Sequence, residues 1–146
     1  MEEIRNISHR LAPTFFDATT IEDTFHELID NFNTEKKFTA NIDIDFGKLK
    51  NKLSSEMQLN LYRILQEQMR NIVKYAHASK VNVSIIIENK KLTFIIEDNG
   101  VGFDYQLAKR GIGLANIRRR TELFSGIMEI ISKPNEGCKL ILQIPV

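Results

Sequence analysis

A carboxylate, a carboxamide and an ammonium group recur at helical spacing near the middle of the chain. Glu67, Asn71 and Lys74 follow an i, i+4, i+7 pattern, which places them within an arc of about 60° on an α-helix. This set fits a metal–phosphate site, in which Asn71 offers an oxygen to Mg²⁺, Glu67 acts as general base and Lys74 neutralises phosphate charge. A ladder of ordinary surface charges has the same spacing, so the pattern leaves both interpretations open.

Two glycine-rich segments follow. Asp98 comes directly after an apolar run and precedes Gly100 and Gly102, whose missing side chains let the backbone approach a flat ligand. A carboxylate there can accept a hydrogen bond from the amino group of adenine, although Asp-Asn-Gly is also strong turn chemistry. Gly111 and Gly113 precede a helix, where free amide groups favour an anion, and a plain flexible connection is the alternative.

Hydrophobic periodicity predicts the elements that must position these residues. Apolar residues at helical spacing predict helices over 20–33, over 55–76 and from the glycine turn to about 124. Alternating apolar residues predict strands over 37–46, 81–87, 92–97, 127–132 and 138–144. We expect a charged loop over 48–52. The mixture of helices and hairpins predicts an α+β fold, with a mixed, mostly antiparallel sheet covered by helices on one face.

Composition limits the classes of function. The 146 residues are enough for one domain, and 20 Lys and Arg against 19 Asp and Glu argue against nucleic-acid binding. Cys138 is the single cysteine, which excludes an internal disulfide and a cysteine-based zinc site. The sequence also lacks a P-loop, an apolar run long enough to span a bilayer and a signal peptide. We therefore expect a cytoplasmic domain without direct membrane contact.

The three polar segments, in this order, resemble the GHKL ATPases, which include gyrase, heat-shock chaperones, mismatch-repair ATPases and sensor histidine kinases. The N, G1 and G2 boxes of that superfamily look like Glu67-x3-Asn71-x2-Lys74, Asp98-x-Gly100-x-Gly102 and Gly111-x-Gly113-Leu114. Residues 61–67 and 113–117 are most similar to the sensor histidine kinases that signal to helix-turn-helix response regulators. The resemblance covers about residues 20–146 and implies the Bergerat fold, an α/β sandwich that binds ATP with Mg²⁺.

The resemblance implies a role for each matching residue. Glu67 matches the proposed catalytic base, Asn71 the Mg²⁺ ligand and Lys74 a phosphate-contacting residue. Asp98 matches the residue that bonds the adenine amino group. The remaining ATP-binding positions are Gly100 and Gly102 at the adenine pocket, Gly111, Gly113 and Leu114 at the phosphates, and Lys109 and Arg110 near the triphosphate in a short ATP lid over 104–110.

The implied activity is that of an ATP-dependent protein-histidine kinase domain, a phosphotransferase. It would donate the γ-phosphate to a histidine on the dimerisation domain of the same kinase, and a response regulator would be a further partner. The motif of that acceptor is absent from this sequence, and His9 does not match it. Residues 1–13 resemble the end of the second dimerisation helix, so we expect the catalytic domain over 14–146 of a longer protein, whose own membrane anchoring is left open.

Two other functions remain open at this stage. One is a freestanding kinase of the anti-sigma-factor type that acts on a serine of a partner protein. The other is a GHKL fold that serves as a non-catalytic interaction module. One departure bears on the nucleotide site: Gly137-Cys138 stands where the family often has Gly-Thr, which places a thiol near the adenine and predicts weaker water-mediated contacts there.

Overall fold

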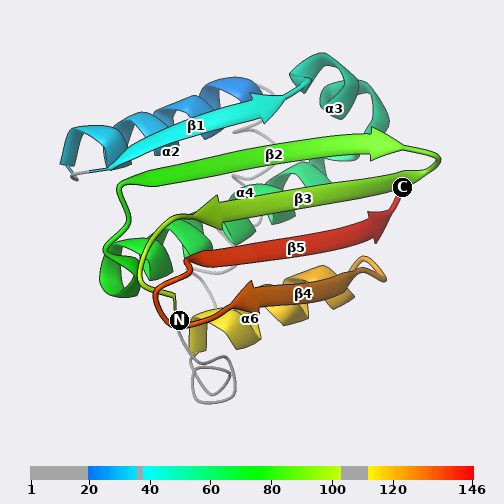
Figure 1. Ribbon diagram of the computed structural model, residues 1–146. Helices are drawn as coiled ribbons and strands as arrows, with labels where there is room; N and C mark the ends of the chain where they lie inside the picture. Colours follow the sequence, from blue (N-terminus) through cyan, green and yellow to red (C-terminus); the bar gives the residue numbers. More distant parts are fainter. Residues whose placement is uncertain (1–19, 36–37, 103–111) are drawn as a thin grey trace, which may run out of the picture.

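The computed structural model describes residues 20–35, 38–102 and 112–146 of the protein, which form a sheet with helices packed on it (Figure 1). The sheet has five strands in the order β1-β2-β3-β5-β4. β1 runs parallel to β2, and the other neighbouring pairs are antiparallel. The strands are β1 (Thr39–Ile44), β2 (Lys80–Glu88), β3 (Lys91–Asp98), β4 (Ile127–Ser132) and β5 (Cys138–Pro145).

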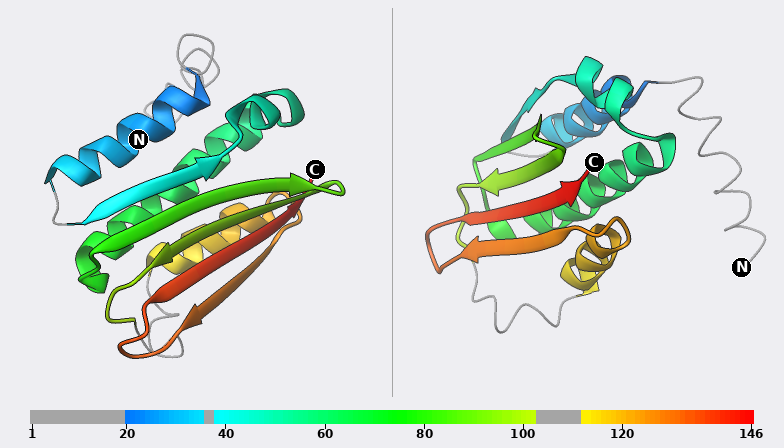
Figure 2. Two further views of the ribbon diagram at one scale, coloured as in Figure 1. Left: turned by 45° about the horizontal axis from the view of Figure 1, so that its top comes forward. Right: turned by 90° about the vertical axis from the view of Figure 1, so that its right-hand side faces the viewer.

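The longer helices cover one face of this sheet. They are α2 (Ile21–Glu35), α4 (Ser55–Asn71) and α6 (Ile112–Glu122), and Figure 2 shows all three on the same side of the strands. The short helix α3 (Phe46–Lys52) follows β1, and no helix of the described residues covers the opposite face. The expected α+β architecture, with a mixed sheet and helices on one face, is confirmed. None of the helices in the described ranges has the length and apolar character needed to cross a bilayer.

The core lies between the sheet and the helices. Strand β2 alternates buried and outward-facing side chains, as the period of two requires. Helix α4 contributes four side chains with no exposed surface, namely Leu61, Ile64, Leu65 and Met69. Phe25 of α2 is equally buried and packs edge-on against Phe46, with ring centroids 5.9 Å apart. Since each such side chain contributes about 1.5–3 kcal/mol on burial, this core holds α4 firmly against the sheet.

Local sequence signals explain where several elements begin and turn. Thr20 Oγ1 accepts a hydrogen bond from the amide of Asp23 at 3.1 Å, and Ser54 Oγ accepts one from the amide of Met57 at 3.1 Å. Both are N-caps, which satisfy amide groups that the first helical turn leaves free. Asn89 and Lys90, both at positive φ, close the hairpin between β2 and β3.

The sequence prediction is wrong at two places between residues 46 and 76. The segment expected as a charged loop is the helix α3, because the Asp45 carboxylate caps its start at the amide of Lys48, 3.1 Å away, and Leu49 anchors it in the core. The helix expected to run regularly to residue 76 is α-helical only to Asn71. Its last five residues form a π-helix, η1 (Ile72–Ala76), which ends at His77 with φ of 49°.

Candidate functional site

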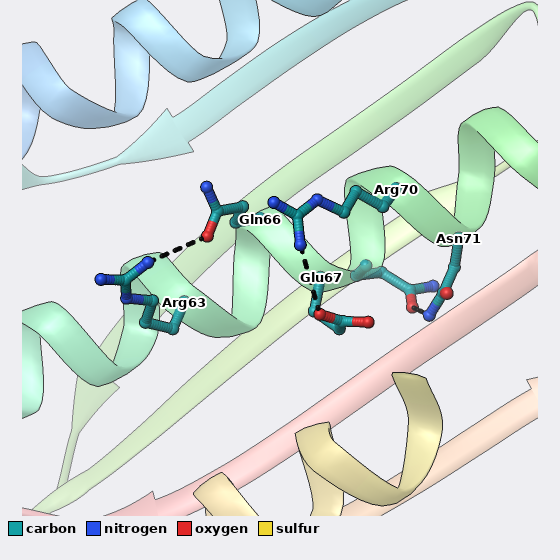
Figure 3. Close-up of polar contacts among 6 residues, drawn as sticks. Arg63, Gln66, Glu67, Arg70 and Asn71 are labelled. Carbon is teal, nitrogen blue, oxygen red and sulfur yellow. Dashed lines mark hydrogen bonds and ion pairs between the residues drawn. The ribbon is translucent and has the colours of Figure 1, made fainter. Parts of the chain in front are cut away.

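One face of α4 carries the polar residues that the spacing singled out. Glu67 and Asn71 project from the same side of the helix, as expected from their separation of four residues (Figure 3). Both side chains are half-buried, and that of Glu67 is 26% exposed. Its carboxylate lies 3.8 Å from the guanidinium of Arg70, which is more than half exposed. Glu67 is therefore a carboxylate at the rim of the core, within reach of solvent.

The carboxamide of Asn71 is oriented by its neighbour one turn earlier. Its Nδ2 donates a hydrogen bond to Oε1 of the buried Gln68 at 3.2 Å, so Oδ1 is the end that this bond leaves for another ligand. No group of three His, Cys, Asp or Glu residues in the described ranges could hold a metal by itself. A single amide oxygen suits Mg²⁺, which keeps several waters and takes its other ligands from phosphates.

Lys74 stands apart from this pair. It lies in η1, beyond the last regular α-helical residue, and its side chain is exposed. The spacing of 3.6 residues per turn, which put Lys74 beside Asn71, does not apply across a π-helix, where each residue bonds five positions along the chain. The structure therefore brings Glu67 and Asn71 to one helix face and leaves the ammonium group of Lys74 on the exposed turn that follows.

Asp98 is the last residue of β3, and its side chain is buried. Its Oδ1 accepts a hydrogen bond from the amide of Gly100 at 2.8 Å. Burial raises the pKa of Asp98 above its ordinary value, the bond from Gly100 lowers it in part, and the nearby charge of Glu97 raises it further. The site thus offers a desolvated carboxyl group that is already oriented by the backbone.

The glycines after Asp98 let two backbone segments meet. A Cβ on Gly100 would lie 2.1 Å from the carbonyl oxygen of Ala76 at the end of η1, and the amide of Val101 donates to that same oxygen at 2.7 Å. Gly102 has φ of 65°, and a Cβ there would lie 2.0 Å from the carbonyl oxygen of Lys133. The described part of this loop is therefore fixed between the end of η1 and the turn before β5.

Cys138 pairs with Asp98 across β5 and β3. Burial and the neighbouring charge of Asp98 raise the pKa of the Cys138 thiol to about 12, against a smaller opposite effect of its hydrogen bond with Ser132. The thiol is therefore neutral at physiological pH, and Cys138 lies beside Asp98 in the sheet. The residue before it, Gly137, is equally constrained, because a Cβ there would lie 2.3 Å from the Asp98 carbonyl oxygen.

The second glycine segment is only partly described. Gly113 and Leu114 lie in the first turn of α6, and Leu114 packs against the core. The other residues assigned to the phosphates and lid, namely Lys109, Arg110 and Gly111, lie outside the described residues. Figure 1 shows α6 running opposite to α4, so that its start lies near the end of α4.

Sequence reasoning missed three residues at the contact between α4 and α6. Asn60 Nδ2 donates a hydrogen bond to the backbone oxygen of Arg120 at 2.9 Å and so joins the two helices. Arg63 lies between Asn60 and Glu67 on the same face of α4. Extending the helical spacing backwards from Glu67 would have found Arg63 and Asn60, but nothing local to α6 indicates Arg120 as their partner.

The three expected segments meet at one end of the sheet. The end of α4 with η1, the end of β3 and the start of α6 lie at the same edge of the molecule (Figure 1). The hydrogen bond from Val101 to Ala76 and the packing of α4 on α6 hold them there. Residues separated by more than 40 positions in the sequence thus surround one region, with a buried carboxyl group on one side and an amide and a carboxylate on the other.

Comparisons with known proteins place the chain among nucleotide-dependent enzymes. The pattern of the family described as histidine kinase-, DNA gyrase B-, and HSP90-like ATPase matches residues 56–146. The chain is 30% identical to the signal transduction histidine-protein kinase/phosphatase DegS of Brevibacillus brevis, over 100% of this chain and 38% of that protein. It is 28% identical to the sensor histidine kinase LiaS of Bacillus subtilis (strain 168), over 99% of this chain and 39% of that protein. The chain thus spans about two fifths of the length of these curated relatives.

Solved structures agree on the fold. The blue-light activated histidine kinase of Erythrobacter litoralis EL346 superposes with a TM-score of 0.70 at 15% identity, over 83% of this chain and 40% of that one. The histidine kinase AdeS of Acinetobacter baumannii superposes with a TM-score of 0.66 at 15% identity, over 99% of this chain and 80% of that one. At this identity the similarity shows the fold alone, and it confirms the Bergerat α/β sandwich expected from the sequence.

Proposed function

Because the chain belongs to the histidine kinase-, DNA gyrase B-, and HSP90-like ATPase family, we propose that it is the ATP-binding catalytic domain of a sensor histidine kinase. The family implies ATP as the nucleotide. The chain binds ATP with Mg²⁺ and donates the γ-phosphate to a histidine on the dimerisation domain of the same kinase. The names of the relatives, which match nearly the whole chain, favour this function over a serine kinase of the anti-sigma-factor type.

One observation carries the proposal: the buried carboxyl group of Asp98 and the Glu67–Asn71 face of α4 flank the same end of the sheet. Asp98 accepts from the adenine amino group, since a desolvated carboxyl oxygen beside an amide donor is a specific acceptor. Gly100 and Gly102 keep the loop against η1 and so shape the base-binding side. Their close approach to the backbone of Ala76 and Lys133 holds the end of β3 against η1.

The phosphate side is formed by residues of α4, η1 and α6. Asn71 Oδ1 is the protein ligand for Mg²⁺, which supplies charge neutralisation at the phosphate oxygens when it is bound. The exposed ammonium of Lys74 reaches towards the phosphates on its long side chain. Gly113 and Leu114, in the first turn of α6, offer amide groups to the phosphates. The resemblance assigns Gly111 to the phosphates as well, and Lys109 and Arg110 to the triphosphate as part of a short lid over 104–110, all of which lie outside the described residues.

Glu67 acts on the histidine that accepts the phosphate. Its carboxylate takes the proton that leaves the attacking imidazole, while the transfer itself depends mainly on positioning and charge neutralisation. The half-buried place of Glu67 at the rim supports this role, because the acceptor histidine must approach from outside the chain. A carboxylate sealed in the core could not meet it.

The wider assignments follow from the same proposal. We assign 14–146 to the catalytic domain, and residues 1–13, which lie outside the described residues, to a remnant of the dimerisation domain on the basis of their sequence. The full-length kinase passes the phosphate from its histidine to a response regulator, and this domain acts in the cytoplasm without contact with nucleic acid or membrane.

Radiolabel transfer tests the function directly. The chain is mixed with [γ-³²P]ATP, Mg²⁺ and a dimeric dimerisation domain from the same full-length kinase. We expect slow, acid-labile labelling of that domain's histidine and no appreciable labelling of the chain alone, because no acceptor is held in place there. Glu67→Gln should depress the rate and leave ATP binding nearly unchanged, since a base acts on the nucleophile.

The control variant is Glu56→Gln, an exposed carboxylate in the first turn of the same helix, which should transfer at the parent rate. Acid-stable labelling of a serine in a partner would instead establish the serine-kinase alternative. A chain that binds no ATP would be a non-catalytic interaction module. Labelling of His9 would show that this residue is a phosphate acceptor, contrary to the sequence analysis.

A further inference from the structure

The side chain of Asn99 joins the turn after β3 to the start of β2. Its Oδ1 accepts hydrogen bonds from the backbone amides of Ser79 and Lys80, both at 2.9 Å. Its Nδ2 donates to Ser79 Oγ at 2.8 Å. The backbone amide of Asn99 also donates to the Lys80 carbonyl oxygen at 3.2 Å. One exposed residue thus makes four hydrogen bonds to two neighbouring residues of the chain.

The residues that Asn99 binds are themselves fixed in the sheet. Lys80 is the first residue of β2, and its Cα pairs with that of Thr39 in β1. The carbonyl oxygen of Ser79 accepts a hydrogen bond from the amide of Thr39 at 2.9 Å. Asn99 is therefore anchored to a part of the sheet that both β1 and β2 hold in place.

These bonds restrict the turn that orients the Asp98 carboxyl group. The backbone angles of Asn99 set the direction of the Gly100 amide, which donates to Asp98 Oδ1 at 2.8 Å. Glycine has the greatest backbone freedom of any residue, so Gly100 does not hold this direction by itself. Because Asn99 is fixed through both its backbone amide and its side chain, the Gly100 amide stays directed at Oδ1, and Oδ2 of Asp98 is left for another donor.

The turn has a second attachment on its other side. The amide of Val101 donates to the Ala76 carbonyl oxygen at 2.7 Å, which holds the turn against η1. The bonds of Asn99 hold the same turn against β2. Gly100 lies between these two attachments in the chain, so the loss of either would let its amide rotate away from Asp98.

We propose that Asn99 is a positioning residue for the adenine acceptor: by fixing the Gly100 amide, its side chain orients the Asp98 carboxyl group towards the base. The inference rests on the proposed function, in which Asp98 accepts from the adenine amino group. The hydrogen bonds described for the Asn99 side chain all go to Ser79 and Lys80, so it acts on the nucleotide only through Asp98. The order that it supplies is present before ATP binds, and ATP binding therefore does not have to order the turn.

Calorimetry with ATP and ADP, and with GTP as a competitor, tests this role on the chain. Asn99→Ala should weaken ATP and ADP equally, by about fivefold, because both carry adenine, and should change GTP by less than about twofold. A merely structural loss would weaken the three nucleotides alike. Alanine is compatible with the backbone here, since Asn99 is not at positive φ. The matched control is Asn82→Ala, an exposed asparagine on β2, which should bind as the parent does.

A conservative variant tests whether the accepting oxygen of Asn99 is what matters. Asn99→Asp keeps an oxygen that accepts from the amides of Ser79 and Lys80, so it should bind ATP within about twofold of the parent. A loss as large as that of Asn99→Ala would overturn the inference. If Asn99→Ala does not fold, Asn99→Ser, whose hydroxyl can accept from one of the two amides, takes its place and is judged by the same ratio of ATP to GTP affinity.

A double-mutant cycle with Asp98 separates positioning from a general effect on the turn. In an Asp98→Asn background, Asn99→Ala should cost less than about twofold in ATP affinity, since the acceptor through which Asn99 acts is already altered. An equal loss of ATP affinity in both backgrounds, or a loss of GTP affinity as large as that of ATP, would overturn the inference.

The two proposals fail in different ways. A parent chain that binds no ATP, or that binds ATP and GTP equally, overturns the adenine role of Asp98 and this inference with it. A parent that prefers ATP and loses affinity in Asp98→Asn, but not in Asn99→Ala, overturns the positioning role of Asn99 alone.

Discussion

The two sides of the proposed nucleotide site differ in composition: one is made of backbone and the other of side chains. On the adenine side, backbone meets backbone: Gly100 lies against the Ala76 carbonyl, Gly102 against that of Lys133, and Asp98 is buried. The phosphate side is formed by partly exposed side chains of α4. The closest charged pair there, Glu67 with Arg70, is 3.8 Å apart. The proposed base-binding side is held by backbone contacts, whereas the proposed phosphate side consists of accessible side chains.

This difference has a physical reason. A base is flat and keeps its shape, so it is best recognised by fixed backbone and one desolvated acceptor. In the proposed transfer, the phosphoryl group changes charge and position and its acceptor comes from another domain, so the groups that act on it must stay accessible. Substitutions on the adenine side should therefore affect stability and binding together, and those on the phosphate side should affect function alone.

The largest effect should come from a methyl group at Gly100. Gly100→Ala puts a Cβ 2.1 Å from a backbone oxygen, which cannot move aside, and should cost about 3 kcal/mol of stability. The melting temperature should fall by about 10 °C, and ATP affinity should fall with it. Gly47→Ala is the control, because the nearest atom to its Cβ is at 3.5 Å and alanine favours the helix. Equal melting temperatures for the two variants would mean that the loop at Gly100 is not fixed against η1.

Asp98→Asn should weaken ATP and ADP alike, by about thirtyfold or about 2 kcal/mol. The carboxyl group has two oxygens, one for the Gly100 amide and one for the adenine amino group, whereas the amide side chain offers one. Calorimetry with both nucleotides measures the effect, and GTP should bind poorly to the parent.

The control for Asp98→Asn is Asp43→Asn, an exposed carboxylate on β1 that should change nothing. A parent that binds ATP and GTP equally would count against Asp98 as the adenine acceptor. If Asp98→Asn lowered the affinity for ATP but not for ADP, Asp98 would contact the phosphates and not the adenine.

Asn71→Ala should reduce the affinity for Mg-ATP about tenfold, or about 1.4 kcal/mol, with little change in melting temperature. Its side chain is half-buried and bonds only to Gln68 among the hydrogen bonds described, so its loss should leave the core intact. Titrations with Mg²⁺ and with EDTA separate the metal effect from direct binding. Asn82→Ala, exposed on β2, is the control. Loss of the same size in EDTA would show that Asn71 acts without the metal.

The smallest effect concerns Cys138 at alkaline pH. The folded pKa of about 12 exceeds the unfolded value of about 8.5, so the folded thiol keeps a proton that the unfolded thiol releases. The stabilisation is complete below about pH 8.5 and is lost as the pH rises towards 12. Between pH 8.5 and 9.5 the parent should lose about 1 kcal/mol more than Cys138→Ala in urea unfolding. Parallel losses in the two proteins would mean that the thiol ionises freely on this side of the site.

Much of this protein follows from local sequence. Alternating apolar residues determine β2, β3 and β5, and the caps at Thr20 and Ser54 determine where two helices begin, because these signals act between neighbours in the chain. The order of the three polar segments likewise indicates the ATPase family. The charged run at 48–52 was wrongly predicted to be a loop. One buried apolar residue, Leu49, and the Asp45 cap are enough to form a short helix that packs on the core.

Other features were decided only by the tertiary structure. Residues 72–76 form a π-helix whose end meets the loop at Gly100, and regular α-helical spacing therefore does not describe the position of Lys74. The raised pKa of Asp98 needs burial by surrounding elements, and the hydrogen bond from Asn60 to Arg120 needs α6 to pack on α4. Periodicity records which face of an element is apolar, but it does not say which distant element will cover that face, and the chemistry of this site depends on that partner.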